Sequence, residues 1–256
     1  NKHETVSYKN ESSDHLTEEG KNQAKASAKD IEDKKVDLII ASPFVRTRET
    51  AEIVRSELGL PESSVVFDER LKEINPGEFD GKQWKEYHEY IYENTGRKWF
   101  EGRIPGGESL KEVGKRVGES LYDLESKYKD KNILIVTHGG AAWLSYVVAG
   151  IYTPENKEYK KADTHVFVNE FKRFSNAEVR ELPFVPLPHN EDFMLDLHKP
   201  YIDEITLEKD GEEIKNIDRE VYNKLTTLKQ TLLSVASKPT KEFFTHLHTF
   251  LILSIA

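Results

Sequence analysis

A short apolar run at residues 133–136 constrains the fold of this chain most strongly. It follows a highly charged segment and ends on Thr137-His138-Gly139-Gly140. Consecutive apolar, mostly β-branched residues bounded by charge and glycine are typical of a strand buried on both faces of a parallel sheet. Ligands of such sheets bind beyond the carboxyl ends of the strands. His138 is therefore either placed for chemistry or an ordinary strand-end histidine that caps the next helix.

A second strand is predicted at residues 36–41, with the sequence VDLIIA, and it leads directly into a new helix through SPFVRTRETA. Backbone N–H groups at a helix N-terminus favour an anion, and a guanidinium matches the geometry of phosphate. Arg46 and Arg48 in this junction are thus candidates for an anion site. The alternative is that both are surface helix residues, which is the better interpretation for either one taken alone.

Glu73 follows a short predicted strand at residues 65–67 and precedes the turn Asn75-Pro76-Gly77. A carboxyl group beside a strand end acts as a general acid when burial or a neighbouring anion raises its pKa. Taken alone, one glutamate among 46 acidic residues is more typical of solvated surface. Further along, Ser109 is expected to cap an amphipathic helix that runs to about Tyr128 and leads into the strand at 133–136.

Composition narrows the classes of function. The chain has no cysteine, which excludes a disulfide frame, a thiolate nucleophile and a cysteine-ligated zinc within it. It carries 37 basic against 46 acidic residues, a net charge of −9, which argues against general nucleic-acid affinity. No apolar run approaches the roughly 20 residues that span a bilayer, so no membrane partner is expected. We expect a cytoplasmic location.

Five motifs occur in a fixed order along the chain, namely LTEEGKNQA, SPFVRTRETA, LKEINPGEFDGK, PGGES and IVTHGG. Together they resemble the histidine phosphatase superfamily, the phosphoglycerate-mutase-like phosphatases. The resemblance begins at His15, and the phosphatase-like domain is assigned to residues 1–182. It implies an α/β fold, a three-layer α/β/α sandwich on a mostly parallel sheet. It also implies hydrolysis or transfer of phosphoryl groups through a phosphohistidine, without a metal or other cofactor.

The resemblance also implies roles for three residues. Arg46 matches the arginine that clamps the phosphate, Glu73 the proton donor to the leaving group, and His138 the second histidine, which contacts the transferring group. Positioned cations and hydrogen-bond donors suit the loose, charge-rich transition state of phosphoryl transfer. The expected substrate is a small phosphorylated compound. Its identity is not predicted, because specificity in this family lies in variable loops such as residues 82–103.

The nucleophile is where the chain departs from the family pattern. The family begins with a strand that ends in Arg-His-Gly, and this sequence contains neither that strand nor that tripeptide. Lys2-His3-Glu4-Thr5 is one explanation, as a degenerate version of the motif. The other, favoured because a core strand is hard to dispense with, is that the motif precedes Asn1 and the sequence is a fragment. In both cases this chain alone is expected to be inactive.

A second resemblance begins after a proline-rich stretch. DLHKPYIDEI, at residues 196–205, is similar to a segment of class I isoleucyl-tRNA synthetases, with a generic extended linker as the alternative. The synthetase-like segment is assigned to residues 183–218, and residues 219–256 are interpreted as a helical tail of unknown role. The phosphatase-like domain would then be embedded in or fused to an isoleucine-tRNA ligase, with tRNA and ATP as partners of the remaining synthetase.

Two further hypotheses stay open. The domain could be a non-catalytic module that binds a phosphorylated ligand or a tRNA end and regulates the ligase. It could also be a structural spacer within a synthetase fragment. The discriminating observation is whether Arg46, Glu73 and His138 converge around one phosphate-sized anion.

Overall fold

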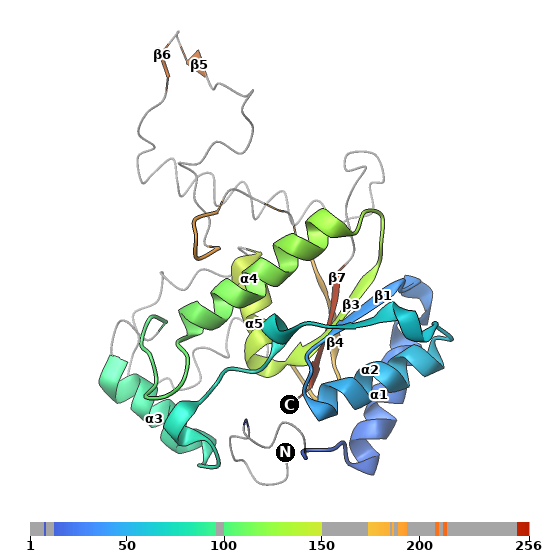
Figure 1. The fold of residues 1–256 in the computed structure, drawn as a ribbon, viewed down its shortest axis with the longest axis horizontal. Coiled ribbons are helices and arrows are strands. Elements are labelled where there is room, and N and C mark those ends of the chain that lie inside the picture. Colours follow the sequence, from blue (N-terminus) through green and yellow to red (C-terminus); the bar gives the residue numbers. More distant parts are fainter. Residues whose placement is uncertain are drawn as a thin grey trace.

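The computed structural model describes residues 8, 13–95, 100–149, 174–184, 186, 189–193, 208–209, 212–213 and 250–255. Its centre is a five-stranded sheet in the order β2-β1-β3-β7-β4 (Figure 1). Neighbouring strands are parallel except β4, which runs antiparallel to β7. The strands are β1 Leu38–Ala41, β2 Val65–Phe67, β3 Ile133–His138, β4 Val179–Leu182 and β7 Phe250–Ile255. The predicted α/β class with a mostly parallel sheet is confirmed.

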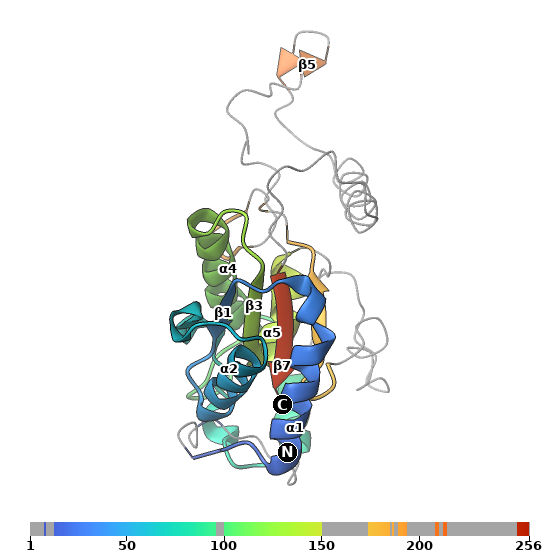
Figure 2. The same cartoon turned by 90° about the vertical axis from the view of Figure 1, so that its right-hand side faces the viewer.

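Helices cover both faces of this sheet. Figure 2 shows α1 and α4 on opposite sides of β3 and β7. The helices are α1 Glu18–Asp30, α2 Val45–Glu57, α3 Trp84–Thr95, α4 Leu110–Lys127 and α5 Gly139–Val148, and the short 3-10 turns are η1 Glu32–Lys34, η2 Glu62–Ser64, η3 Glu69–Leu71 and η4 Gly77–Phe79. A separate two-stranded pair consists of β5 Glu208–Lys209 and β6 Glu212–Glu213. No helix within the described residues is both long and apolar enough to cross a membrane.

Alternation along β3 divides the core into two halves. Ile133 and Ile135 belong to the cluster that packs under α4 and α5, whereas Leu134 and Val136 belong to the cluster under α1 and α2. All four are fully buried, as the apolar run predicts for a strand covered on both faces. The result is the expected three layers.

Side-chain caps fix where two helices begin. The hydroxyl of Thr17 accepts a hydrogen bond from the Gly20 amide at the start of α1. Ser109 and Glu112 form a reciprocal capping box at the start of α4, so that two otherwise unpaired backbone donors are satisfied. The start of α4 agrees with the sequence prediction.

Strand β7 corrects the interpretation of the C-terminal segment. The helical tail predicted for residues 219–256 is wrong for Phe250–Ile255, which forms a strand with six buried residues. This strand lies between β3 and β4 and pairs in parallel with β3, from Ile133 opposite Phe250 to His138 opposite Ile255. A segment of only six residues that are apolar except for Ser254, most of them branched, suits a doubly covered strand better than a helix. The position between β3 and β4 in the sheet is thus occupied by β7.

Other predictions fall outside the described residues. Those are His3, the DLHKPYIDEI stretch at 196–205, and the remainder of the predicted tail at 219–249.

Candidate active site

Two adjacent parallel strands bring the candidate residues to one edge of the sheet. Ala41, the last residue of β1, pairs with Val136 of β3, and the backbone amide of Ser42 donates to the Val136 carbonyl. Because the carboxyl ends of parallel strands meet at the same edge, the junction between β1 and α2 lies beside the end of β3. Arg46 and His138, 92 positions apart in the sequence, make contact there.

The imidazole of His138 is held on both ring nitrogens. Its Nδ1 lies 3.1 Å from Nη2 of Arg46, and its Nε2 lies 2.8 Å from Oγ of Ser42. A guanidinium can only donate, so Nδ1 accepts and the ring proton sits on Nε2, which donates to Ser42. His138 is the N-cap residue of α5, as the capping alternative expects, but its side chain forms no cap hydrogen bond with that helix and contacts Arg46 and Ser42 instead.

The environment of His138 opposes a positive charge on the ring. The residue is 0% exposed. Burial is the largest cause that lowers its pKa well below the ordinary value, and the positive charges of Arg46 and Arg116 act in the same direction. The ring is therefore neutral at neutral pH in this arrangement.

Arg46 has hydrogen-bonding capacity left over. Its Nη1 is buried and has no hydrogen-bond partner within the described part of the chain. The guanidinium carbon lies 4.9 Å from the ring centre of Phe44, which packs edge-on against His138 at 4.9 Å. The surface alternative is thus wrong for Arg46. It fits Arg48, which is exposed, with its guanidinium over the ring of Phe67.

Glu73 approaches the site from the neighbouring loop. Its Oε1 accepts a hydrogen bond from the Ile74 amide at 2.9 Å, and its Oε2 from the Gly140 amide at 3.3 Å. That amide belongs to the first turn of α5, where backbone donors have no partner within the helix. A Cβ atom at Gly140 would lie 2.5 Å from Oε1 of Glu73, so glycine is required for this approach.

Opposing effects act on the Glu73 carboxyl. Burial is the largest and raises its pKa above the ordinary value, while the two amide hydrogen bonds and the charges of Arg46 and Arg116 lower it. The net shift is upward, in the direction that favours a protonated carboxyl. The solvated-surface alternative for Glu73 is therefore wrong.

Some neighbours of the site were not singled out from the sequence. Ser42 belongs to the strand-to-helix junction that was interpreted as an anion site, whereas Phe44 of the same SPFVRTRETA motif was not singled out. The Tyr8 ring packs edge-on against Phe44 at 5.3 Å, and Nζ of Lys72 lies 5.6 Å from the Phe44 ring centre. Neither had a sequence signal. No group of three or more potential metal-ligating side chains occurs among the residues that the structure describes.

Comparison with known proteins identifies the family. The sequence profile described as "Histidine phosphatase superfamily (branch 1)" matches residues 2–175. The chain belongs to this superfamily. The matched range covers SPFVRTRETA, LKEINPGEFDGK and IVTHGG and ends before the DLHKPYIDEI stretch.

Curated relatives carry names from the same superfamily. One is "Putative phosphoserine phosphatase 2" of Hydrogenobacter thermophilus, 38% identical over 128 residues, which are 49% of this chain and 61% of the relative. Another is "Probable phosphoglycerate mutase GpmB" of Erwinia tasmaniensis, 36% identical over 131 residues, 49% of this chain and 59% of the relative. The chain thus spans about three fifths of the length of these relatives.

Among solved structures, a mycobacterial glucosyl-3-phosphoglycerate phosphatase resembles the chain at 27% identity. The alignment has a TM-score of 0.45 and covers 56% of this chain and 70% of the other.

Proposed function

We propose that this is a phosphoryl-transfer domain that hydrolyses a small phosphomonoester through a phosphohistidine. The observation that carries the proposal is the contact between Arg46 and His138 at the carboxyl edge of the sheet, together with Nη1 of Arg46, which has no hydrogen-bond partner among the described residues. A buried guanidinium with a free donor favours a tetrahedral dianion. The superfamily membership of the chain supports the same chemistry.

The proposed binding step exchanges hydrogen bonds. Phosphate oxygens replace Nδ1 of His138 as the acceptors for Arg46, and the ring then needs a proton on Nδ1 to donate to the same phosphate. The negative charge of the ester favours that proton and offsets the effect of Arg46 on the ring. Ser42 keeps the other nitrogen in place throughout.

The proposed reaction has two halves. A nucleophilic imidazole attacks phosphorus, the bond from phosphorus to the ester oxygen breaks, and the protonated Glu73 carboxyl gives its proton to the leaving oxygen. Water then attacks the phosphohistidine, the Glu73 carboxylate takes a proton from that water, and the P–N bond breaks to release phosphate. The raised pKa of Glu73 supports its role as the acid.

The source of the nucleophilic imidazole has two proposed answers. It is either His3, which lies within the matched range 2–175 but outside the described residues, or a histidine in a segment that precedes Asn1. Replacement of His3 by alanine in a protein extended by the upstream codons separates the two. Loss of phosphohistidine formation in that variant identifies His3, and retention identifies the upstream residue.

The direct test of the site is anion binding. We expect vanadate to bind the chain and Arg46→Met to weaken that binding by about 100-fold, because a charged, bidentate contact to an anion contributes roughly 3 kcal/mol. Arg48→Met, an exposed arginine on the same helix, is the matched control and should bind as the parent does. Equal binding by the parent and the Arg46 variant, measured by isothermal titration calorimetry, would contradict the proposal.

Attachment to an isoleucine-tRNA ligase is a further proposal that rests only on the DLHKPYIDEI stretch. In that setting the alternative role for the domain is a non-catalytic module that binds a phosphorylated ligand or a tRNA end. The full-length gene product should charge tRNA with isoleucine when ATP is supplied. Failure of that assay would contradict the proposed attachment to a ligase but not the proposed phosphatase-type function.

A further inference from the structure

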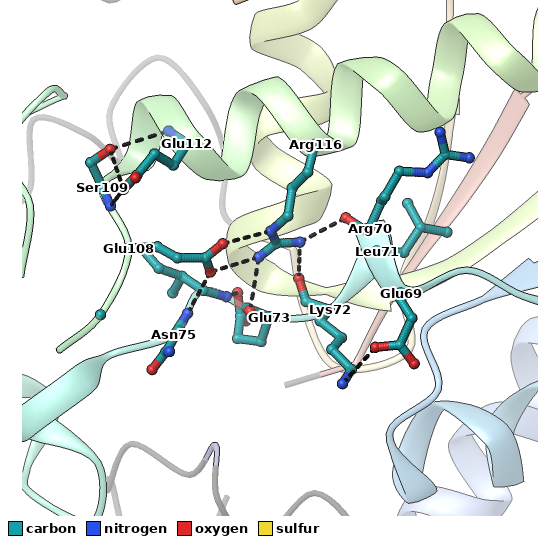
Figure 3. Close-up of polar contacts among 12 residues, drawn as sticks. Glu69, Arg70, Leu71, Lys72, Glu73, Asn75, Glu108, Ser109, Glu112 and Arg116 are labelled. Carbon is teal, nitrogen blue, oxygen red and sulfur yellow. Dashed lines mark hydrogen bonds and ion pairs between the residues drawn. The ribbon is translucent and has the colours of Figure 1, made fainter.

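The guanidinium of Arg116 donates hydrogen bonds to backbone carbonyls of the loop that carries Glu73. This arginine lies on α4, and its Nη1 donates to the carbonyls of Arg70 and Lys72, both at 2.7 Å. Its Nη2 donates to the carbonyl of Glu73 itself at 3.0 Å (Figure 3). One planar guanidinium therefore donates hydrogen bonds to three carbonyls within four consecutive residues. These bonds restrict the conformation of that stretch of backbone.

Glu108 completes this arrangement from the opposite side. Its carboxylate accepts from Nε and Nη2 of Arg116, at 2.9 and 3.0 Å, in a two-point ion pair. The same carboxylate accepts from the backbone amide of Asn75 at 2.9 Å, and the Glu108 amide donates to the Asn75 carbonyl at 2.9 Å. The side chains of Arg116 and Glu108 are only 17% and 22% exposed. The backbone is thus held by hydrogen bonds at Glu73 itself and two residues later, at Asn75 (Figure 3).

We infer that Arg116 is a positioning residue, which holds the loop so that the Glu73 carboxyl stays buried against the Gly140 amide. The inference rests on the proposed function, in which that carboxyl is the acid. Among the described residues, the hydrogen bonds of Arg116 reach backbone carbonyls and the Glu108 carboxylate, and not the side chains of Arg46, Glu73 or His138.

Two effects of Arg116 on Glu73 act in opposite directions, so the experiment must separate them. Its positive charge lowers the pKa of the Glu73 carboxyl. Its hydrogen bonds to the loop maintain the burial of that carboxyl, and burial raises the pKa. Arg116→Lys keeps the charge but removes the planar fork, because a single ammonium cannot span the three carbonyls and the Glu108 carboxylate. This variant isolates the positional effect.

The test follows Glu73 in the intact chain by side-chain carboxyl NMR and the Gly140 amide by hydrogen exchange. In Arg116→Lys, we expect the Glu73 pKa to fall toward the ordinary value, since a released carboxyl regains water. Exchange of the Gly140 amide should accelerate about tenfold or more, because it loses its acceptor. Gly140→Ala displaces the carboxyl directly and provides the reference pKa of a released Glu73.

Arg180→Lys is the matched control. Arg180 is 20% exposed and also forms an ion pair with a glutamate, Glu178, but lies on β4. It should leave both signals of Glu73 and Gly140 unchanged. Glu108→Gln weakens the ion pair with Arg116 without changing Arg116 itself. It should change the Glu73 pKa and the Gly140 exchange rate in the same direction as Arg116→Lys, and it replaces that variant if Arg116→Lys does not fold.

A folded Arg116→Lys protein with the parent's Glu73 pKa and Gly140 exchange rate would overturn the inference. A higher Glu73 pKa in this charge-preserving variant would also overturn it. Neither readout depends on phosphate release, so failure of the anion-binding test above leaves the position of Glu73 measurable. The two proposals therefore fail separately.

Discussion

The hydrogen bonds of His138 fix a single tautomer. Arg46 can only donate, so the Nδ1 lone pair is occupied and the proton is confined to Nε2, beside Ser42. The buried surroundings of His138 stabilise the neutral ring relative to the protonated ring. Folding is thereby linked to pH through one buried side chain.

The lowered pKa of His138 makes the folded state less stable as the pH falls. The pKa of His138 is lower in the folded than in the unfolded chain, so below about pH 6.5 the unfolded chain binds a proton that the folded chain does not. His138 therefore contributes stability above pH 6.5, and that contribution is lost as the pH falls toward the folded pKa.

His138→Gln tests this contribution. Glutamine retains an acceptor for Arg46 and a donor for Ser42 but does not titrate. Between pH 7.5 and 5.5 the parent should lose about 1 kcal/mol more unfolding free energy than the variant, measured by urea denaturation. His15→Gln, which removes a histidine that is 62% exposed, is the control. Parallel pH curves for the parent and His138→Gln would contradict the assignment.

Residue-level signals found part of the site and missed the rest for a physical reason. Arg46, Glu73 and His138 stand in motifs at strand ends, where local sequence already indicates an edge of the sheet. Arg116 is one arginine on an amphipathic helix, and its importance comes from carbonyls about 45 positions earlier. Backbone acceptors leave no pattern in the sequence, so such a contact is visible only in three dimensions.

At the scale of elements, α4 depends on its first turn. The capping box of Ser109 and Glu112 lies one residue beyond Glu108 and about two turns before Arg116, so it sets the start of the helix that presents that arginine. Caps of this kind contribute roughly 1 kcal/mol.

Ser109→Ala should accordingly lower the unfolding free energy by about 1 kcal/mol, because it leaves a backbone donor of the first turn unpaired. Ser126→Ala is a matched control near the other end of the same helix, where the serine is exposed, and should change stability by less than about 0.5 kcal/mol. Chemical denaturation of the two variants side by side checks the difference. Equal losses would mean that the cap has no special role.

Prediction of elements succeeded where local signals were complete. The strands β1 and β3 and the start of α4 follow from apolar runs and a capping residue that are visible in the local sequence. Strand β7 was missed because Phe250–Ile255, which is apolar except for Ser254, fits a helix or a strand equally by periodicity, and only its length favours a strand. Its partners, β3 and β4, cannot be identified from that run alone.

At the scale of the whole molecule, β7 joins the two halves of the core. Ile252 belongs to the cluster under α4 and α5, and Leu253 to the cluster under α1 and α2. Both are less than 2% exposed. The strand is therefore an interior strand of the sheet, between β3 and β4, and its side chains pack in both layers.

Ile252→Ala and Leu253→Ala should each lower the unfolding free energy by about 2–5 kcal/mol, since each opens a cavity in a closely packed core. Their effects should be nearly additive if the two halves of the core act independently, because the side chains point to opposite faces. Val66→Ala on the edge strand β2, where valine is 38% exposed, is the control and should have a much smaller effect. Thermal and urea unfolding of the single and double variants measure these values.

The place of β7 in the sheet has a consequence for biosynthesis. A ribosome completes β3 more than a hundred residues before it reaches Phe250, so both β3 and β4 leave the exit tunnel with an open edge beside them. Pairings between such distant segments form slowly, and unpaired edges attract other nascent chains. Chaperone engagement during translation should therefore be most prolonged in the interval between Leu182 and Phe250.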